Sequence, residues 1–104
     1  MEIFSKDISE LKETTFHGDI LKQKEYSKEY NKYLYERYIV RNGKETLIGY
    51  EIVIPVKHKN PDGTIVFVYP SSSDFGKKGW YLSAKASRSD IEKIMYCKGN
   101  PYEL

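Results

Sequence analysis

Cysteine is nearly absent from this chain, and the single one, Cys97, has no second cysteine with which to form an internal disulfide. Such a composition is typical of proteins from a reducing compartment. No apolar run approaches the roughly 20 residues that a membrane helix needs. The first residues also lack the basic start and apolar stretch of a signal peptide. We therefore expect a cytoplasmic protein that does not associate with a membrane.

The motifs of common catalytic and cofactor sites are missing as well. No Gly-Lys-Ser/Thr or Gly-x-Gly-x-x-Gly pattern is present to hold a phosphate, and no Gly-x-Ser-x-Gly elbow to present a nucleophile. His17 and His58 lie far apart, without cysteines or paired carboxylates at metal-binding spacing. We predict that the protein is not an enzyme and has no cofactor and no metal site.

One tripeptide resembles a catalytic motif. Asp74-Phe75-Gly76 matches the magnesium-binding tripeptide of protein kinases, but the chain has no glycine-rich loop and no His-Arg-Asp sequence. The chain is also far too short for that fold. Because Asp and Gly are common turn residues, we predict a turn here, inside a polar loop over residues 70–79.

The residues that are present describe a folded domain. The chain has 104 residues, of which 39% are hydrophobic and 14% aromatic, and its net charge is +2. This length fits one domain, residues 1–104, and this hydrophobic content excludes a disordered chain. Basic residues outnumber acidic ones nine to five over residues 20–60, whereas residues 1–19 carry two basic and five acidic residues. The middle of the chain is therefore mildly basic.

Apolar and aromatic residues alternate between Tyr33 and Ala84, which is typical of antiparallel strands. Turn sequences divide this region into four expected strands, at about 34–41, 46–56, 64–69 and 80–84. Asn42-Gly43 is a strong hairpin signal, and the parity of the apolar faces favours a bulged hairpin with a longer loop. The third strand is apolar on both faces, so we expect it to be central.

Three helices are expected outside this region. Asp7 with Glu10 and Ser89 with Glu92 have the spacing of capping boxes, which start a short N-terminal helix and a C-terminal one. We expect Phe4, Ile8 and Leu11 to share one face of the first helix, and Ile91, Ile94 and Met95 to form the buried stripe of the last. Between them, Tyr26 and Tyr30 recur at helical spacing, so a second helix is expected from Asp19 to about Lys32, although residues 26–38 are also compatible with a strand. The predicted fold is α+β: a four-stranded, meander-like antiparallel sheet, with two N-terminal helices and one C-terminal helix packed on one face.

Ten tyrosines exceed what one core of this size can bury with every hydroxyl satisfied, so some should be exposed. Tyrosine is enriched at protein–protein interfaces because it covers area while keeping a polar tip. The predicted partner-binding surface combines a helix face with a basic cluster at one end of the sheet. Its residues are Lys24, Tyr26, Lys28, Tyr30, Lys32, Arg41, Lys44, Lys77 and Lys78.

For function we favour a small binding protein that inhibits or regulates a macromolecule by covering it. Abundant Lys and Tyr with scarce Ala also favour a phage or mobile-element origin, in which case the partner would be a host or defence-system protein. The alternative is a nucleic-acid-binding module that uses the basic segment 20–60, because lysines and aromatics together can hold phosphates and stacked bases. An interleaved-sign surface that only keeps the protein soluble remains a third interpretation.

Overall fold

The computed structural model describes residues 7–101, which form ten short elements. The seven strands are β1 (Glu13–Phe16), β2 (Asp19–Ser27), β3 (Lys32–Arg41), β4 (Lys44–Val53), β5 (Val56–Lys59), β6 (Ile65–Val68) and β7 (Gly79–Ser83). The helical elements are the 3-10 turn η2 (Ile8–Glu10), α1 (Ser72–Lys78) and α2 (Arg88–Met95). The α+β class and the antiparallel pairing agree with the sequence prediction.

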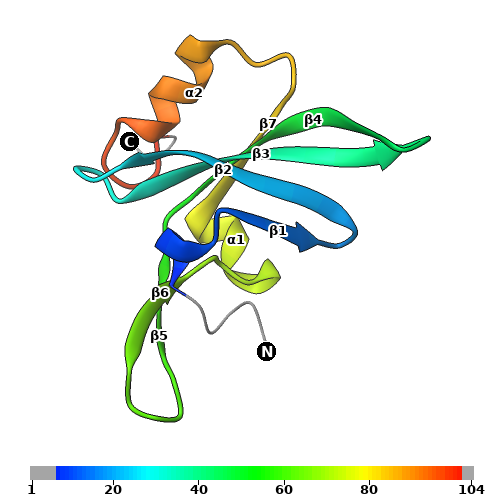
Figure 1. Ribbon diagram of the computed structural model, residues 1–104. Helices are drawn as coiled ribbons and strands as arrows, with labels where there is room; N and C mark the ends of the chain where they lie inside the picture. The colour runs from blue at the N-terminus through cyan, green and yellow to red at the C-terminus, as the bar shows by residue number, and fades with distance from the viewer. Residues whose placement is uncertain (1–6, 102–104) are drawn as a thin grey trace.

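A five-stranded antiparallel sheet, in the order β1-β2-β3-β4-β7, is the centre of the molecule. Helix α2 covers one face, while η2 and α1 lie on the other side, as Figure 1 shows. Strands β5 and β6 form a separate two-stranded hairpin that projects away from the sheet. The four-stranded sheet with all helices on one face was therefore wrong.

The sheet is apolar on both faces, and each face has its own core. On the α2 side, Leu34 and Ile52 pack against Ile91, Ile94 and Met95 of the helix. On the opposite side a cluster of buried residues surrounds η2: Ile8, Leu11, Leu21, Tyr33, Tyr35, Val53 and Tyr69. The predicted apolar stripe of the C-terminal helix is confirmed, and so is the burial of Ile8 and Leu11. Phe4, which was expected beside them, lies outside the described residues.

The expected helix from Asp19 to Lys32 is a strand instead. Residues His17 and Gly18 both have positive φ, at 53° and 83°, and form the turn that folds β2 back on β1. Strand β2 then pairs along β3, where Tyr26 lies opposite Tyr33. The helical spacing of the tyrosines arises because Tyr26 belongs to the strand and Tyr30 to the turn after it. Long-range pairing outweighed this local signal.

The first predicted hairpin is correct in its strands but wrong in its loop. Arg41 pairs with Lys44, so the loop is the two-residue turn Asn42-Gly43, in which both residues have positive φ. The register shifts farther along, where Ile48 has no partner on β3. This bulge places Leu34 beside Ile52 on the α2 face, as the parity argument requires.

Two further expectations are corrected. The third strand is not central: β6 pairs only with β5, and Ile65 and Phe67 are about half exposed. The predicted loop over residues 70–79 contains helix α1, so Asp74-Phe75-Gly76 is helical and not a turn. Phe75 packs against the core beneath the sheet. The ring of Phe75 gives the helix an apolar anchor, which explains why this polar segment folds.

The predicted helices at the two ends are confirmed in position and changed in detail. At the start, the Asp7 carboxylate accepts a hydrogen bond from the N–H of Ser9, and the helix is a single 3-10 turn. At the end, the capping box is Ser87 with Asp90, two residues before the predicted one. Within the described residues, no helix has the length and apolar character needed to cross a membrane.

Candidate functional site

The most distinctive exposed surface lies where the β5–β6 hairpin meets the turn between β2 and β3. A shallow hollow of about 330 Å³ opens there, lined by Asp7, Ile8, Tyr26, Asn31, Tyr33, Pro55 and Phe67. Ile65 follows the same side of β6. We call Tyr26, Tyr33, Pro55, Ile65 and Phe67 the hairpin surface, because four of these side chains line the hollow and Ile65 lies on the same side of β6 as Phe67.

Three of these side chains are exposed although they are large and apolar. Tyr26 is 45% exposed, Phe67 45% and Ile65 51%. Single exposed apolar residues are ordinary on protein surfaces. Residues that border one hollow form a patch, and such patches mark interaction sites more often than isolated residues do.

The sheet side of the hairpin surface is rigid. The rings of Tyr26 and Tyr33 stack with centroids 4.3 Å apart, and Tyr33 itself is buried. Burial raises the pKa of Tyr33, with smaller contributions from Tyr26 and Asp7. Its phenol is therefore neutral near pH 7. A preordered aromatic pair loses little side-chain entropy when a partner covers it.

The hairpin side combines apolar and basic groups. Lys57 lies opposite Phe67, and Lys59 opposite Ile65, so all four side chains share one face of the two-stranded hairpin. The face is fixed to the domain by Asp7, whose Oδ2 accepts from the N–H of Phe67 at 3.4 Å. The Ser9 hydroxyl bonded to its carboxylate holds the pKa of Asp7 below its usual value. The acid thus keeps its charge where it binds the main chain of the hairpin.

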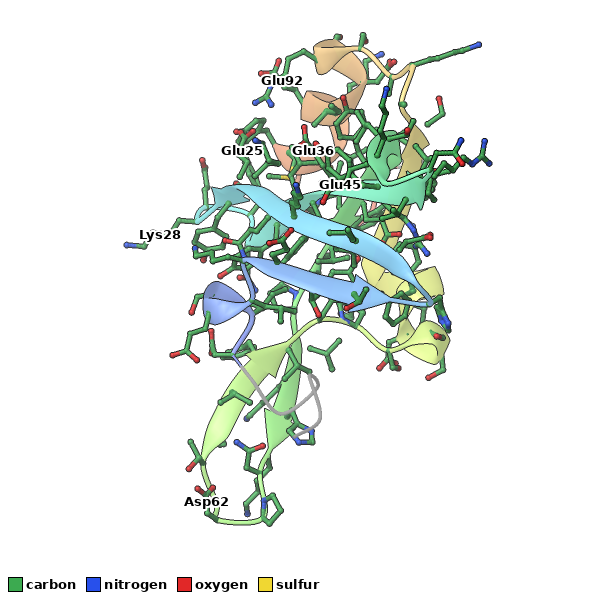
Figure 2. The ribbon with its side chains drawn as sticks, turned by 45° about the vertical axis from the view of Figure 1, so that its right-hand side comes forward. Glu25, Lys28, Glu36, Glu45, Asp62 and Glu92 are labelled. Atoms are coloured by element: carbon green, nitrogen blue, oxygen red, sulfur yellow. The ribbon has the colours of Figure 1, made fainter. Side chains whose placement is uncertain are left out.

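The predicted residues on β2, β3 and the turn between them are separated by the structure. Tyr26 lies on the hairpin surface, Lys28 is exposed in the adjacent turn, and Tyr30 is half-buried there. Lys24 projects to the other face of the sheet, with its ammonium 3.9 Å from the Glu36 carboxylate. In Figure 2 the Lys28 side chain points into solvent, away from the labelled acids Glu25, Glu36 and Glu45.

Lys32 is the clearest correction among the predicted residues. It was placed on an exposed helix face, but its side chain is fully buried beneath α2. Its Nζ donates to the carbonyl oxygens of Ile94, Cys97 and Gly99 at 2.7, 2.8 and 2.7 Å. Lys32 is therefore a structural residue that holds the end of α2 to the sheet.

The predicted basic cluster at one end of the sheet is divided. Arg41 and Lys44 flank the turn at one end of β4, while the carbonyl of Lys78 accepts from Ile54, just beyond the other end. Lys77 precedes Lys78 in α1 and lies at that same end. The cause is the interposed β5–β6 hairpin and α1, which change the meander that the prediction assumed. These lysines do not form one patch.

Sequence reasoning missed Phe67 and Ile65 because it assigned the third strand to the sheet centre. It left Lys57 and Lys59 outside the predicted surface because they follow the expected end of the second strand. A signal was available in the turn sequence Asn60-Pro61-Asp62-Gly63, which joins two stretches of only four residues each, 56–59 and 65–68. Pro55 and Pro70 stand just outside these stretches and interrupt pairing with longer strands. That pattern is typical of a short independent hairpin.

A second cluster of polar residues, around Glu51, is buried and lies apart from the hairpin surface. Glu51, only 3% exposed, accepts hydrogen bonds from the guanidinium of Arg37 and the hydroxyl of Tyr69, and Arg37 also binds Asp19 at 2.7 Å. Burial and the nearby carboxylate raise the pKa of Tyr69, so its hydroxyl remains a donor. Each charged group is satisfied by another member of the cluster, which is how structural ion pairs are built.

Among residues 7–101, no three His, Cys, Asp or Glu side chains lie close enough together to hold a metal ion. The expectations of no metal and no cofactor stay predictions. Comparison with known proteins gave no match: no family model, no curated protein and no solved structure is similar to this chain.

Proposed function

We propose that this protein is a non-enzymatic binding protein that docks its hairpin surface on another protein and blocks the region it covers. The observation that carries the proposal is the joint exposure of Tyr26 and Phe67 in one hollow, with exposed Ile65 on the same side of β6 as Phe67. Aromatic side chains supply most of the affinity at protein interfaces because they bury a large area with few rotatable bonds. A central aromatic group with charged neighbours is the usual anatomy of such an interface.

The shape of the molecule supports blocking as the mode of action. The β5–β6 hairpin projects from the domain, and its tip carries Asp62, as Figures 1 and 2 show. A projecting two-stranded hairpin can enter a cleft that a flat surface cannot reach. Lys57 and Lys59 on its apolar face favour a partner with an acidic rim. Inhibition of a host or defence-system protein by a phage or mobile-element product remains our interpretation of this combination.

The experiment compares three forms of the protein as bait in a lysate of the cell that encodes it. The forms are the natural chain, the double variant Tyr26→Ser/Phe67→Ser and the control Val40→Ser, whose side chain is 53% exposed on the far part of β3. A partner should be captured by the natural chain and the control, but not by the double variant. With the partner purified, we expect the double variant to weaken Kd by about 30-fold or more, which corresponds to roughly 2 kcal/mol for residues at an interface centre.

Equal affinity of the double variant and the natural chain would contradict the proposal. The nucleic-acid alternative is tested with the same proteins and a random duplex. If it holds, affinity should fall steeply between roughly 50 and roughly 200 mM salt, because each phosphate contact releases counterions. An aromatic protein interface should change little over that range.

A further inference from the structure

Strand β7 is an edge of the five-stranded sheet, and part of its main chain faces away from every other strand. The N–H of Ala84 donates to the carbonyl of Ile48 at 3.1 Å. Because bonded and non-bonded pairs alternate in an antiparallel ladder, Leu82 faces β4, whereas Tyr81 and Ser83 turn outward. Within the described part of the chain, nothing bonds the N–H or C=O of Tyr81 or the N–H of Ser83.

This edge lacks the usual protection against strand addition. Natural edge strands carry charges, prolines or a covering segment that prevents another chain from pairing with them. Strand β7, Gly79-Trp80-Tyr81-Leu82-Ser83, has neither a charge nor a proline. The opposite edge differs, since β1 begins with Glu13 and has only four residues. The sequence therefore leaves β7 open while the other edge is shorter and charged.

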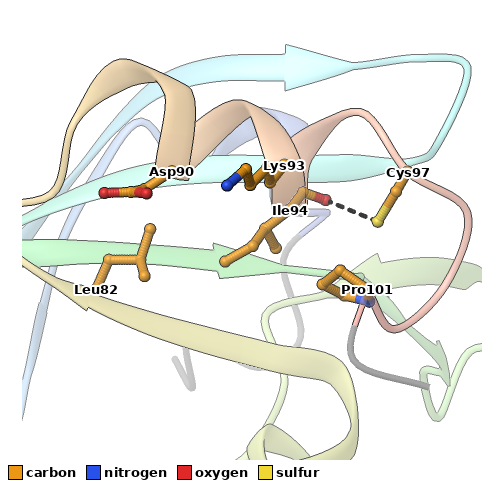
Figure 3. A pocket seen from close by; sticks show the side chains of 6 residues that line it. All are labelled: Leu82, Asp90, Lys93, Ile94, Cys97 and Pro101. Atoms are coloured by element: carbon orange, nitrogen blue, oxygen red, sulfur yellow. Dashed lines mark hydrogen bonds between the residues drawn. The ribbon is translucent and has the colours of Figure 1, made fainter. Parts of the chain in front are cut away.

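A groove of about 440 Å³ runs beside this edge, between β7 and α2. Figure 3 shows Leu82 on its strand side and Asp90, Lys93 and Ile94 on its helix side, with Pro101 at one end. Of the α2 residues in the lining, Asp90 and Lys93 are exposed, whereas Ile94 also belongs to the core on this side of the sheet. A strand added to β7 would lie about 4.8 Å from it, and every second side chain would project into this groove.

Basic residues lie in the groove lining and just beyond both ends of β7. Lys93 lines the groove, Lys78 directly precedes β7, and Lys85 follows two residues after the strand. The one acid in the lining is Asp90, whose carboxylate is already occupied by the N–H of Ser87 at 3.0 Å in the capping box of α2. That hydrogen bond holds the pKa of Asp90 below its usual value. Charge complementarity therefore favours an acidic segment.

The same charges disfavour pairing between two copies of this chain. If β7 paired antiparallel with its counterpart around Tyr81, the end of the strand next to Lys78 in one copy would lie beside the end followed by Lys85 in the other. Like charges brought close together at the ends of a ladder repel each other. An extended segment with acidic residues at both ends meets no such repulsion.

We propose that the groove between β7 and α2 binds an extended, acidic peptide segment of another protein by adding it as a strand to the edge of the sheet. The main chain of the segment bonds to Tyr81 and Ser83, one apolar side chain enters between Leu82 and Ile94, and its flanking acids face the lysines. Main-chain bonding gives affinity in this mode of recognition, and the groove selects the side chain. The site is separate from the hairpin surface and does not depend on it.

The test uses a library of random nine-residue peptides, selected on the natural chain and measured by fluorescence anisotropy. We expect enrichment of alternating apolar sequences with acidic ends. The decisive variants are Ser83→Pro, which removes one outward N–H without removing a bond to β4, and Ser83→Ala, which keeps it. Ser83→Pro should weaken Kd at least 10-fold, and Ser83→Ala should leave it within about 2-fold.

A second measurement keeps the test informative if Ser83→Pro fails to fold. In the natural chain, added peptide should slow hydrogen exchange of the Tyr81 and Ser83 amides and leave the Phe67 amide unchanged. Absence of enriched peptides, equal binding of the lysine-ended counterparts, unchanged exchange at Tyr81 or formation of a dimer through β7 would each overturn the proposal. The Tyr26→Ser/Phe67→Ser variant should bind the peptides normally, so failure of the hairpin surface would not affect this result.

Discussion

The ammonium group of Lys32 donates a 2.7 Å hydrogen bond to the carbonyl oxygen of Ile94, 62 residues later in the chain. Two further carbonyls, of Cys97 and Gly99, accept its remaining hydrogens. One side chain at the start of β3 thus satisfies three main-chain acceptors at and beyond the end of α2, where a helix leaves its last carbonyls without partners. Its charge also suits the negative end of the helix dipole.

We expect Lys32→Met to lower the free energy of unfolding by about 3 kcal/mol or more, because three acceptors lose their donor and burial prevents water from replacing it. Lys28→Met is the matched control in the adjacent turn, and because Lys28 is exposed it should change stability by less than about 0.5 kcal/mol. Urea denaturation followed by tryptophan fluorescence gives both values, since Trp80 lies beside Lys32, with Nζ 4.9 Å from its ring centroid. Equal effects of the two substitutions would contradict this assignment.

The Glu51 cluster predicts a second stability difference. Glu51→Ala leaves the partly buried guanidinium of Arg37 with only Asp19 and removes the acceptor of Tyr69, so we expect a loss of about 3 kcal/mol. Glu45 provides the comparison: its carboxylate lies 2.6 Å from Lys22, but both side chains are substantially exposed. Glu45→Ala should therefore cost less than about 1 kcal/mol. Chemical denaturation at neutral pH measures both variants, and a small effect of Glu51→Ala would show that the cluster is not needed.

The contact between α2 and β2 should depend on pH through Glu25. Its carboxylate accepts from both terminal nitrogens of Arg88, at 2.7 and 2.8 Å, and from the hydroxyl of Tyr96. The Arg88 guanidinium, with help from Tyr96, lowers the pKa of Glu25. A depressed carboxyl pKa contributes stability above the unfolded-state value, and this contribution disappears as pH falls through the folded-state value.

Glu25→Gln should therefore destabilise the protein at pH 7 and have a smaller effect near pH 3. Because Arg88 is half exposed, solvent screening limits the difference at pH 7 to about 1 kcal/mol. Urea denaturation at the two pH values provides the measurement. A difference that persists unchanged at acid pH would mean that the charge of Glu25 is not responsible.

Two glycines should respond in opposite directions to substitution by alanine. At Gly49 an added Cβ would meet the main-chain oxygen of Leu82 at 2.5 Å, as well as the ring of Tyr81, so Gly49→Ala should destabilise by about 2 kcal/mol. At Gly76, inside α1, nothing lies within 4 Å of the added atom. Gly76→Ala should stabilise the protein by roughly 0.5 to 1 kcal/mol through helix propensity. Thermal denaturation of the pair tests both signs, and two shifts of the same sign would refute the packing argument.

Local signals predicted the elements that depend on neighbouring residues. Asn42-Gly43 predicted its hairpin because both residues adopt positive φ, and Ile91, Ile94 and Met95 predicted the buried face of α2 by their spacing. The predictions that failed concern features that depend on pairing between strands far apart in the sequence. The strand character of residues 19–27 depends on β1 and β3, and the isolation of β6 depends on which strand fills the position beside β4.

The candidate site was predicted only in part for the same reason. Tyr26 was identified as a surface aromatic, but Lys32 was assigned to the same surface although it is buried. The side on which a residue lies depends on whether its segment is a helix or a strand. Because the segment was predicted as a helix and is a strand, Lys32 was expected on the same surface as Tyr26 although it lies on the opposite face of the sheet. Phe67 could not be identified as exposed while its strand was expected at the sheet centre.

The β5–β6 hairpin has one more consequence, for how such a protein can diversify. The chain leaves the sheet after β4 and returns before α1, with buried Pro55 and Pro70 beside these two crossings. Neither strand of the hairpin pairs with the five-stranded sheet. Insertions, deletions or exchange of residues 57–67 would therefore leave the scaffold's ladders intact. The shape and charge of this projection can therefore change while the two cores stay the same, and under the proposed function such a change would alter the target without altering the scaffold.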